Sequence, residues 1–402
     1  MIPRRTFLAA LAAPLATPAA RPIEILPGGA LVVNGRREFV LGLYELPQVR
    51  DPWREIHAAG FNLAHVSPSR DDFARAHDHG LRCWVTLGSI SPEKRAADEE
   101  RIRRVVEEFR KDPALLFWET EDEPAFVSKQ KGPRIPPDRI IATYEFVKRI
   151  DPVHPFYLNH APVNLESTLR EYNPGADILA TDIYPVIPRG IRELYALWPD
   201  GQQGDLLNQS ISQVGQYADR MRRVAGPSRA VWMVLQAFAW ENMRDKDRDP
   251  KMVLYPTYGQ LRFMAYQSVV HGANGLLFWG LAHTPADAPL WPDLKRVAGE
   301  LASLGPVLAR NPIRPPLRIQ YRENGHGVDR GVEWAARALG AGILLVCTNA
   351  DRNPLDLNFH GLSGYVRVER VGEPGSISLS NGSFQETFAP FEAKVYRILS
   401  RS

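Results

Sequence analysis

Short apolar runs alternate with amphipathic stretches along most of the chain. Eight of these runs have the length and composition of buried strands: residues 39–44, 62–66, 83–87, 115–118, 155–159, 178–182, 231–236 and 275–279. Helical patterns lie between them, such as the one that opens at Pro136-Pro137 and places Ile140, Tyr144 and Val147 on one face. Buried strands separated by helices predict a parallel sheet, and eight such strands are the number that closes a (β/α)8 TIM barrel.

The pattern changes at Asn311-Pro312-Ile313-Arg314-Pro315-Pro316, a proline-rich joint that neither a helix nor a central strand accommodates. Beyond it, apolar or alternating runs at 342–348, 365–371 and 393–399 are separated by turn residues, which predicts a small antiparallel β-sandwich. Residues 25–39 have the pattern of a hairpin with Asn34-Gly35 as its turn, and we expect this hairpin to close the bottom of the barrel. The predicted α/β fold is a barrel over 21–310 followed by a sandwich over 311–402.

The first twenty residues have a basic head, a short apolar middle and a small-residue end, which is typical of a secretory signal peptide. Arg4-Arg5-x-Phe7-Leu8 resembles a twin-arginine signal. The apolar run is too short to span a bilayer and is interrupted by Pro14 and Pro18. The sequence therefore predicts a periplasmic or secreted protein, with no stable membrane insertion after the leader (1–20) is removed.

The 402 residues, of which 44% are hydrophobic and 24% charged, are those of an ordinary soluble protein with two domains. A net charge of +3 argues against nucleic acid as a partner. Cys83 and Cys347 lie inside apolar runs, so buried free thiols are favoured over a disulfide. With no paired histidine motif and no phosphate-binding glycine loop, the sequence predicts neither a metal nor a cofactor.

An acidic segment follows the fourth apolar run: Trp118-Glu119-Thr120-Glu121-Asp122-Glu123-Pro124. If the strand continued to alternate, Glu119, Glu121 and Glu123 would point the same way. Three like charges in one cleft are expected to raise at least one carboxyl pKa, as a general acid requires. This segment is therefore the first candidate for chemistry.

Residues 118–124 resemble the Trp-x-x-x-Asn-Glu-Pro-like motif at the fourth strand of clan A glycoside hydrolases, with Asp122 where asparagine is usual. Residues 177–185 and 272–279 look like the sixth and eighth strands of exported bacterial barrels that contain an Asp-Glu-Pro motif. The resemblance covers residues 25–308 and implies a glycosidase in which Glu123 is the proton donor. The alternative is that Glu123 pairs with an arginine or accepts backbone hydrogen bonds.

A second carboxylate is harder to assign, because Gln236 stands where the resemblance implies the glutamate nucleophile of the seventh strand. Glu241, five residues on, is one substitute, unless it forms a salt bridge in its loop. Asp182, at the end of the sixth strand, is the other, unless it orients Tyr184 or caps the loop. A gap of roughly 6.5–9.5 Å between Glu123 and Asp182 would admit a water and predict an inverting mechanism.

Other side chains at the strand ends are candidates for binding an oligo- or polysaccharide. They comprise the aromatic residues Tyr44, Trp118, Tyr184, Trp240 and Trp279, the polar residues Asp122, Asn159, His160 and Gln236, and, more weakly, Glu45 and His65. Asp177 is expected to cap the entry of its strand. Three functions stay open: an exported glycosidase, a barrel that binds carbohydrate without cleaving it, and an exported scaffold for another protein.

Overall fold

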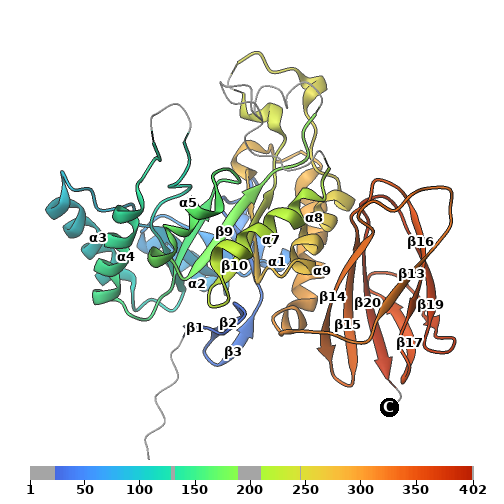
Figure 1. Cartoon of the computed structure of the whole chain (residues 1–402). Coiled ribbons are helices and arrows are strands. Elements are labelled where there is room, and N and C mark those ends of the chain that lie inside the picture. The colour runs from blue at the N-terminus through green and yellow to red at the C-terminus, as the bar shows by residue number, and fades with distance from the viewer. Residues whose placement is uncertain (1–22, 128–131, 189–209, 245, 401–402) are drawn as a thin grey trace, which may run out of the picture.

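A computed structural model describes residues 23–127, 132–188, 210–244 and 246–400 of the chain (Figure 1). The predicted signal peptide at 1–20 lies outside these residues. Within them, every helix is too short or too polar to cross a membrane.

Eight parallel strands form a closed barrel, as predicted, and each pairs with the strands before and after it in sequence. They are β4 (Val40–Leu43), β5 (Leu63–His65), β6 (Arg82–Thr86), β7 (Leu115–Glu119), β8 (Phe156–His160), β9 (Ile178–Ile183), β10 (Ala230–Gln236) and β11 (Gly275–Trp279). The surrounding helices are α1 (Pro52–Ala59), α2 (Arg70–Asp78), α3 (Arg95–Phe109), α4 (Pro137–Ile150), α5 (Glu166–Arg170), α7 (Gln213–Ala225), α8 (Tyr258–Val270) and α9 (Leu290–Leu308).

Alternation along the strands divides the barrel side chains into an inner and an outer set. Trp84, Phe117, Tyr157 and Trp232 meet inside the barrel, with ring centroids 5.3–6.4 Å apart. Their neighbours in sequence pack outward against the helices. The interior is therefore filled by aromatic rings below the carboxyl ends of the strands.

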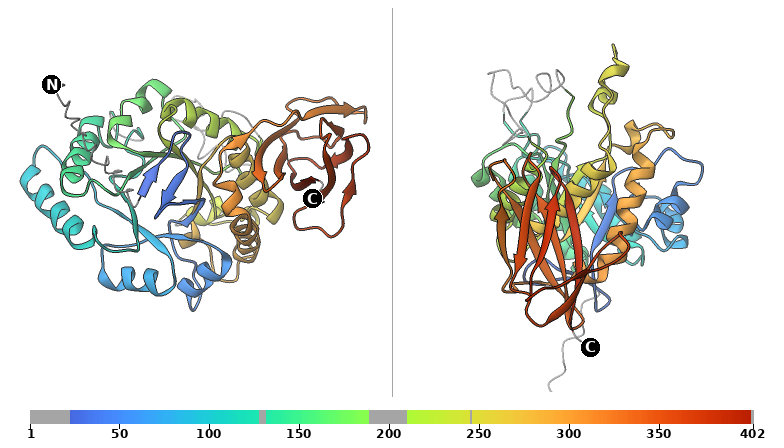
Figure 2. Two further views of the ribbon diagram at one scale, coloured as in Figure 1. Left: turned by 90° about the horizontal axis from the view of Figure 1, so that it is seen from below. Right: turned by 90° about the vertical axis from the view of Figure 1, so that its right-hand side faces the viewer.

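A small antiparallel sheet closes the amino end of the barrel, as the hairpin pattern predicts. It consists of β1 (Ile23–Ile25), β2 (Leu31–Val33) and β3 (Arg36–Glu38). Asn34 and Gly35 turn the chain between β2 and β3 with φ of 50° and 77°, the conformation that favours this residue pair. Ile23, Leu31 and Val33 pack into the barrel interior, and Figure 2 shows the sheet across the ring of strands.

The chain then forms a β-sandwich beside the barrel, again as predicted. Its larger sheet contains β12 (Pro312–Ile313), β14 (Val332–Leu339), β15 (Gly342–Asn349), β20 (Ala393–Ser400), β17 (Tyr365–Arg370) and β18 (Ile377–Ser378), and its smaller sheet β13 (Arg318–Arg322), β16 (Leu355–His360) and β19 (Phe384–Phe388). The larger sheet packs against α8 and α9. Cys83 and Cys347 are buried free thiols, as expected.

Candidate active site

Acidic side chains gather at the carboxyl ends of the barrel strands, the end where catalytic residues of TIM barrels lie. Glu119 is the last residue of β7, and Asp122 and Glu123 lie in the turn that follows it. Asp182 comes from β9, and Glu45 from the segment after β4. Residues far apart in sequence thus form one acidic cluster.

The expectation that Glu119, Glu121 and Glu123 point the same way is wrong, because β7 ends at Glu119 and alternation ends with it. Glu119 points into the barrel, where its Oε2 accepts hydrogen bonds from Trp84 Nε1 at 3.0 Å and Thr86 Oγ1 at 2.6 Å. Glu121 instead accepts a backbone N–H from the loop after β6 at 2.8 Å. Glu123 turns toward β9.

Glu123 and Asp182 share a side-chain hydrogen bond. The backbone places Glu123 there: its φ of 46° is unusual for a residue with a side chain, and its N–H donates to the Asn159 carbonyl at 3.1 Å. Asn159 Nδ2 lies 3.1 Å from Asp122 Oδ1 and 3.4 Å from Asp182 Oδ1, so it bridges two acids. Arg134 Nη1 lies 3.4 Å from Glu123 Oε2, which is the arginine contact that the alternative reading of Glu123 predicts.

The carboxyl pair holds a proton at neutral pH. Burial, followed by the charge of Asp122, raises the pKa of Glu123 to about 7 despite Arg134. Burial and then the charge of Glu123 raise the pKa of Asp182 well above its ordinary value. Asp182 therefore keeps its proton to a higher pH than Glu123 does, and the protonated Asp182 donates a hydrogen bond to the Glu123 carboxylate. The predicted rise in carboxyl pKa is confirmed, but burial contributes more to it than repulsion between like charges does.

The wide gap expected between Glu123 and Asp182 is absent from the structure, so the inverting arrangement with a water between them is wrong. Two carboxyl groups in hydrogen-bond contact leave no room for an attacking water. The expectation treated β7 and β9 as separated by β8. Because Glu123 lies in the turn beyond β7, its side chain reaches across the end of β8 to Asp182.

Gln236, at the end of β10, is fully buried, and its amide is bound by the backbone. Oε1 accepts the Val186 N–H at 2.9 Å, and Nε2 donates to the carbonyls of Val186 and Phe238 at 2.9 and 3.0 Å. The amide thus fixes the segment after β9 onto the end of β10. Its hydrogen-bonding groups are occupied before any sugar arrives.

Glu241 is also buried, and the loop after β10 holds it. Its Oε1 accepts the Asp249 N–H at 2.6 Å and lies 3.5 Å from Arg244 Nη1. Glu241 thus forms the loop salt bridge that was expected if it is not the nucleophile. Glu241 therefore has partners of its own, apart from the Glu123–Asp182 pair.

Three of the predicted aromatic residues lie together. Tyr184 and Trp279 stack with centroids 5.4 Å apart, Phe238 meets both edge-on, and Trp240 donates its Nε1–H to the Tyr184 carbonyl at 3.1 Å. Tyr44 lies elsewhere on the inner face, where its hydroxyl is 2.8 Å from that of Tyr157. The rings of Tyr184, Trp240 and Trp279 provide an apolar wall next to Asp182.

Trp118 and His160 do not belong to this site, contrary to expectation, because each lies one residue from an inward-facing position. Trp118 packs outward and donates its Nε1–H to Asp151 at 2.8 Å. His160 packs outward against Tyr172, and burial lowers its pKa to about 3. Glu119 and Asn159 occupy the corresponding inward positions.

Two weaker candidates lie closer to the cluster. Glu45 Oε2 accepts the Gly280 N–H at 2.9 Å, and burial raises the pKa of Glu45 to about 7. His65 Nε2 lies 3.0 Å from Thr86 Oγ1, and burial lowers the pKa of His65 to about 4, so the ring is neutral. Arg134 was missed by the sequence reasoning, because it lies in a loop without pattern.

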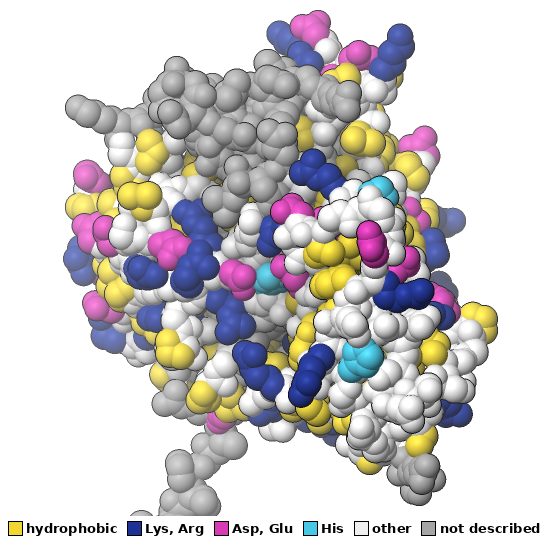
Figure 3. Space-filling view, turned by 45° about the vertical axis from the view of Figure 1, so that its right-hand side comes forward, with side chains coloured by type: hydrophobic (Ala, Val, Ile, Leu, Met, Phe, Trp, Pro, Cys, Tyr) yellow, Lys and Arg dark blue, Asp and Glu magenta, His cyan; other side chains and the backbone are white. Residues whose placement is uncertain are grey.

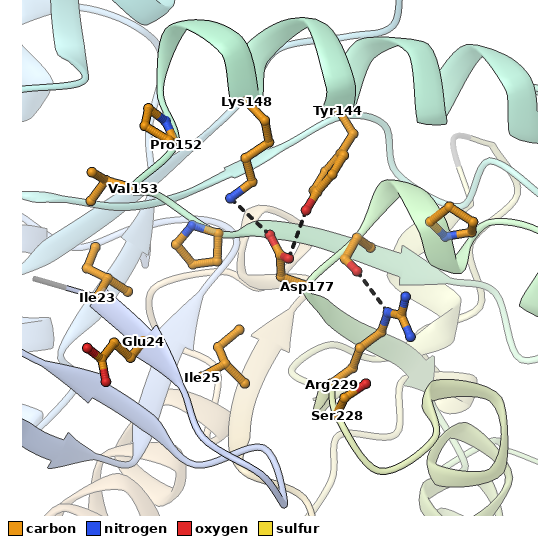
Figure 4. Close-up of a pocket in the computed structure, with 13 residues that line it drawn as sticks. Ile23, Glu24, Ile25, Tyr144, Lys148, Pro152, Val153, Asp177, Ser228 and Arg229 are labelled. Carbon is orange, nitrogen blue, oxygen red and sulfur yellow. Dashed lines mark hydrogen bonds and ion pairs between the residues drawn. The ribbon is translucent and has the colours of Figure 1, made fainter. Parts of the chain in front are cut away.

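A cavity of about 700 Å³ lies at the opposite end of the barrel, between β1 and α4 (Figure 4). Asp177 is central to it: Oδ2 accepts the Phe156 N–H at 2.8 Å, Oδ1 accepts the Tyr144 hydroxyl at 3.1 Å, and Lys148 lies 3.3 Å away. Asp177 therefore holds the entry of the strands, as predicted. This cavity is separated from the acidic cluster by the length of the barrel.

The fold is similar to those of several glycoside hydrolases of known structure. A family 30 subfamily 8 xylanase from Clostridium acetobutylicum aligns with a TM-score of 0.53 and 11% identity over 91% of this chain and 96% of its own. A GH27 β-L-arabinopyranosidase from Geobacillus stearothermophilus aligns at 0.55 and 11% over 90% and 96%, and an α-amylase from Geobacillus thermoleovorans at 0.55 and 8% over 90% and 99%. No protein-family model matches the sequence, and no curated protein does. The chain thus has a glycoside hydrolase-like fold.

Proposed function

We propose that this protein is an exported glycoside hydrolase that cleaves oligo- or polysaccharides with Glu123 as its general acid. The observation that carries the proposal is the hydrogen-bonded pair of Glu123 and Asp182 at the carboxyl end of the barrel. The glycoside hydrolase-like fold and the aromatic wall beside Asp182 support it. The export part rests on the twin-arginine-like pattern at Arg4-Arg5.

Each member of the pair has a distinct role in this proposal. Glu123 is the more exposed of the two, with 22% of its side chain accessible, so it is the member that donates a proton to the glycosidic oxygen. Donation leaves a carboxylate on Glu123. The Asp182 hydroxyl and the Arg134 guanidinium then stabilise that charge, which favours proton transfer in the transition state.

The test follows products by proton NMR when the purified protein is incubated with a panel of plant and bacterial oligosaccharides. Glu123→Gln is expected to reduce turnover by roughly 10²–10⁴-fold, the usual contribution of a general acid. Glu121→Gln is the matched control, since Glu121 belongs to the same segment but accepts a backbone N–H. Equal activity of the wild type and Glu123→Gln would disprove the assignment, and the first-formed anomer reports the stereochemistry.

A second candidate is a barrel that binds carbohydrate without cleaving it. Gln236 favours it, because an amide held by backbone groups stands where clan A enzymes carry their nucleophile. This function predicts ligand-induced shifts in the NMR spectrum with no product at any pH. Product formation that is lost in Glu123→Gln decides for the hydrolase.

A further inference from the structure

A basic cleft of about 680 Å³ lies between the base of the barrel and the β-sandwich. Four arginines line it: Arg222 from α7, Arg310 and Arg314 from the joint between the two parts, and Arg337 from β14. Figure 3 shows Lys and Arg side chains gathered on this face, near the middle of the view. The cleft belongs to neither the acidic cluster nor the cavity at Asp177.

Arg337 is buried in this cleft without an acidic partner among the described residues. Only 4% of Arg337 is exposed, and it lies on the face of β14 that also carries Glu333 and is directed at the barrel. Its Nε donates to the Leu308 carbonyl at 3.0 Å, which caps the end of α9, but its buried Nη1 has no hydrogen-bond partner. A buried cation of this kind is costly unless an anion compensates it.

The two acids that line the cleft are already paired. Glu38 lies 2.8 Å from Arg82, and Glu333 lies 2.9 Å from His271. Glu38 and Glu333 therefore leave the positive charge of the four cleft arginines largely uncompensated.

Arg222 and Arg314, two of the three exposed arginines of the cleft, have side chains without a hydrogen-bond partner among the described residues. Within the part of the chain that the structure describes, the guanidinium groups of Arg222 and Arg314 form neither an ion pair nor a hydrogen bond. Arg222 lies over Gly272, where a Cβ would overlap its guanidinium group. Arg222 and Arg314 also line a second, adjoining hollow, so they stand at a shared edge.

We propose that this cleft binds an oxyanion, a carboxylate or phosphate group, with Arg337 at its floor and Arg222 and Arg314 at its rim. Guanidinium groups match the planar or tetrahedral oxygens of such anions and bind them through paired N–H donors. Arg310 adds charge, since its side chain donates to the Ala338 carbonyl and not to an acid. Carboxylates and phosphates share this chemistry, and the two probes below separate them.

Isothermal titration calorimetry on the full chain tests the proposal, with inorganic phosphate and galacturonate as probes at one fixed ionic strength. We expect saturable 1:1 binding of at least one probe. The double variant Arg222→Gln/Arg314→Gln is expected to weaken it roughly tenfold or more, since each loses a charge-assisted contact. Arg104→Gln, on the exposed face of α3, is the matched control and should bind as the wild type does.

Phosphate binding without galacturonate binding would identify a phosphate group as the ligand, and the reverse would identify the carboxylate of an acidic sugar. Arg337→Gln is expected to abolish binding of either probe. The rim variant keeps the test valid if Arg337→Gln fails to fold, because both rim residues are exposed. Absence of binding to the wild type, or equal binding to the double variant and the control, would overturn the proposal.

Discussion

His271 joins the barrel to the sandwich through two acids, and this contact predicts a stability that depends on pH. His271 lies directly after α8. Its Nδ1 is 2.9 Å from Asp219 Oδ2 on α7, and its Nε2 is 2.9 Å from Glu333 Oε2 on β14. Burial alone would lower the pKa of His271, but the hydrogen bonds to Asp219 and Glu333 outweigh it and raise the pKa to about 9.

The size of the effect follows from linkage between protonation and folding. The rise from 6.5 to about 9 corresponds to about 3 kcal/mol of stabilisation, at roughly 1.4 kcal/mol per tenfold change in proton affinity. Because the folded pKa is raised, this contribution is complete below pH 6.5 and is lost as the pH rises through 9. His271→Gln should therefore cost about 3 kcal/mol of unfolding free energy at acid pH and much less in alkali.

Urea denaturation followed by tryptophan fluorescence measures the difference between the wild type and His271→Gln at several pH values. His77→Gln is the control, since His77 is exposed on α2 and 3.9 Å from its nearest acid. The ionic contact predicts that the difference in unfolding free energy between wild type and variant narrows as the pH rises from 6.5 to 9 and is small above pH 9. Separate transitions for barrel and sandwich in the variant would add to this support. A gap that stays constant with pH would refute the reasoning.

Three other substitutions test individual parts of the structure. Asp122→Asn removes the charge that, after burial, most raises the pKa of Glu123, so a carbon-13 NMR titration should find that pKa lowered from about 7 by roughly one pH unit; an unchanged titration contradicts this. Burial raises the pKa of Glu119 to about 8, so the stability that depends on its protonated form is lost as the pH rises through 8. Urea denaturation should therefore find the unfolding free energy of Glu119→Gln, relative to that of the wild type, higher at pH 9 than at pH 6. Gly272→Ala places a Cβ against Arg222 at a φ of 87°, and calorimetry should find the unfolding free energy lowered by about 1–3 kcal/mol. Because the positive φ strains alanine even if Arg222 moves aside, an unchanged melting temperature would contradict this.

The barrel was predictable because every buried strand carries a continuous apolar run. The run at 178–182 corresponds to β9 (Ile178–Ile183), and the run at 231–236 corresponds to β10 (Ala230–Gln236). Alternation would also have separated Asn159 from His160, since two successive residues of a strand cannot both face inward. Asn159 and His160 were both candidates for the site, although only one of them can face inward.

The contact between Glu123 and Asp182 could not be predicted from apolar runs or from strand alternation. It depends on the backbone of the turn after β7, where Glu123 has a positive φ and binds the Asn159 carbonyl. No residue in that turn marks the conformation, because glycine, the usual residue for it, is absent there. The backbone partners of Gln236 lie fifty residues earlier and on its own loop, so they too required the assembled fold.

The acidic cluster as a whole determines how this barrel responds to pH. Burial is the largest cause of the raised pKa of each of its carboxyl groups, which are Glu45, Glu119, Asp122, Glu123 and Asp182. Ionising all of them would place several negative charges in a poorly hydrated space where, among the described residues, Arg134 is the one cation paired with the cluster. Glu119 and the Glu123–Asp182 pair instead keep protons near neutral pH, and the stability that these protons preserve is lost as the pH rises. In its proposed role as general acid, Glu123 must also be protonated, so activity and barrel stability should both fall above pH 7.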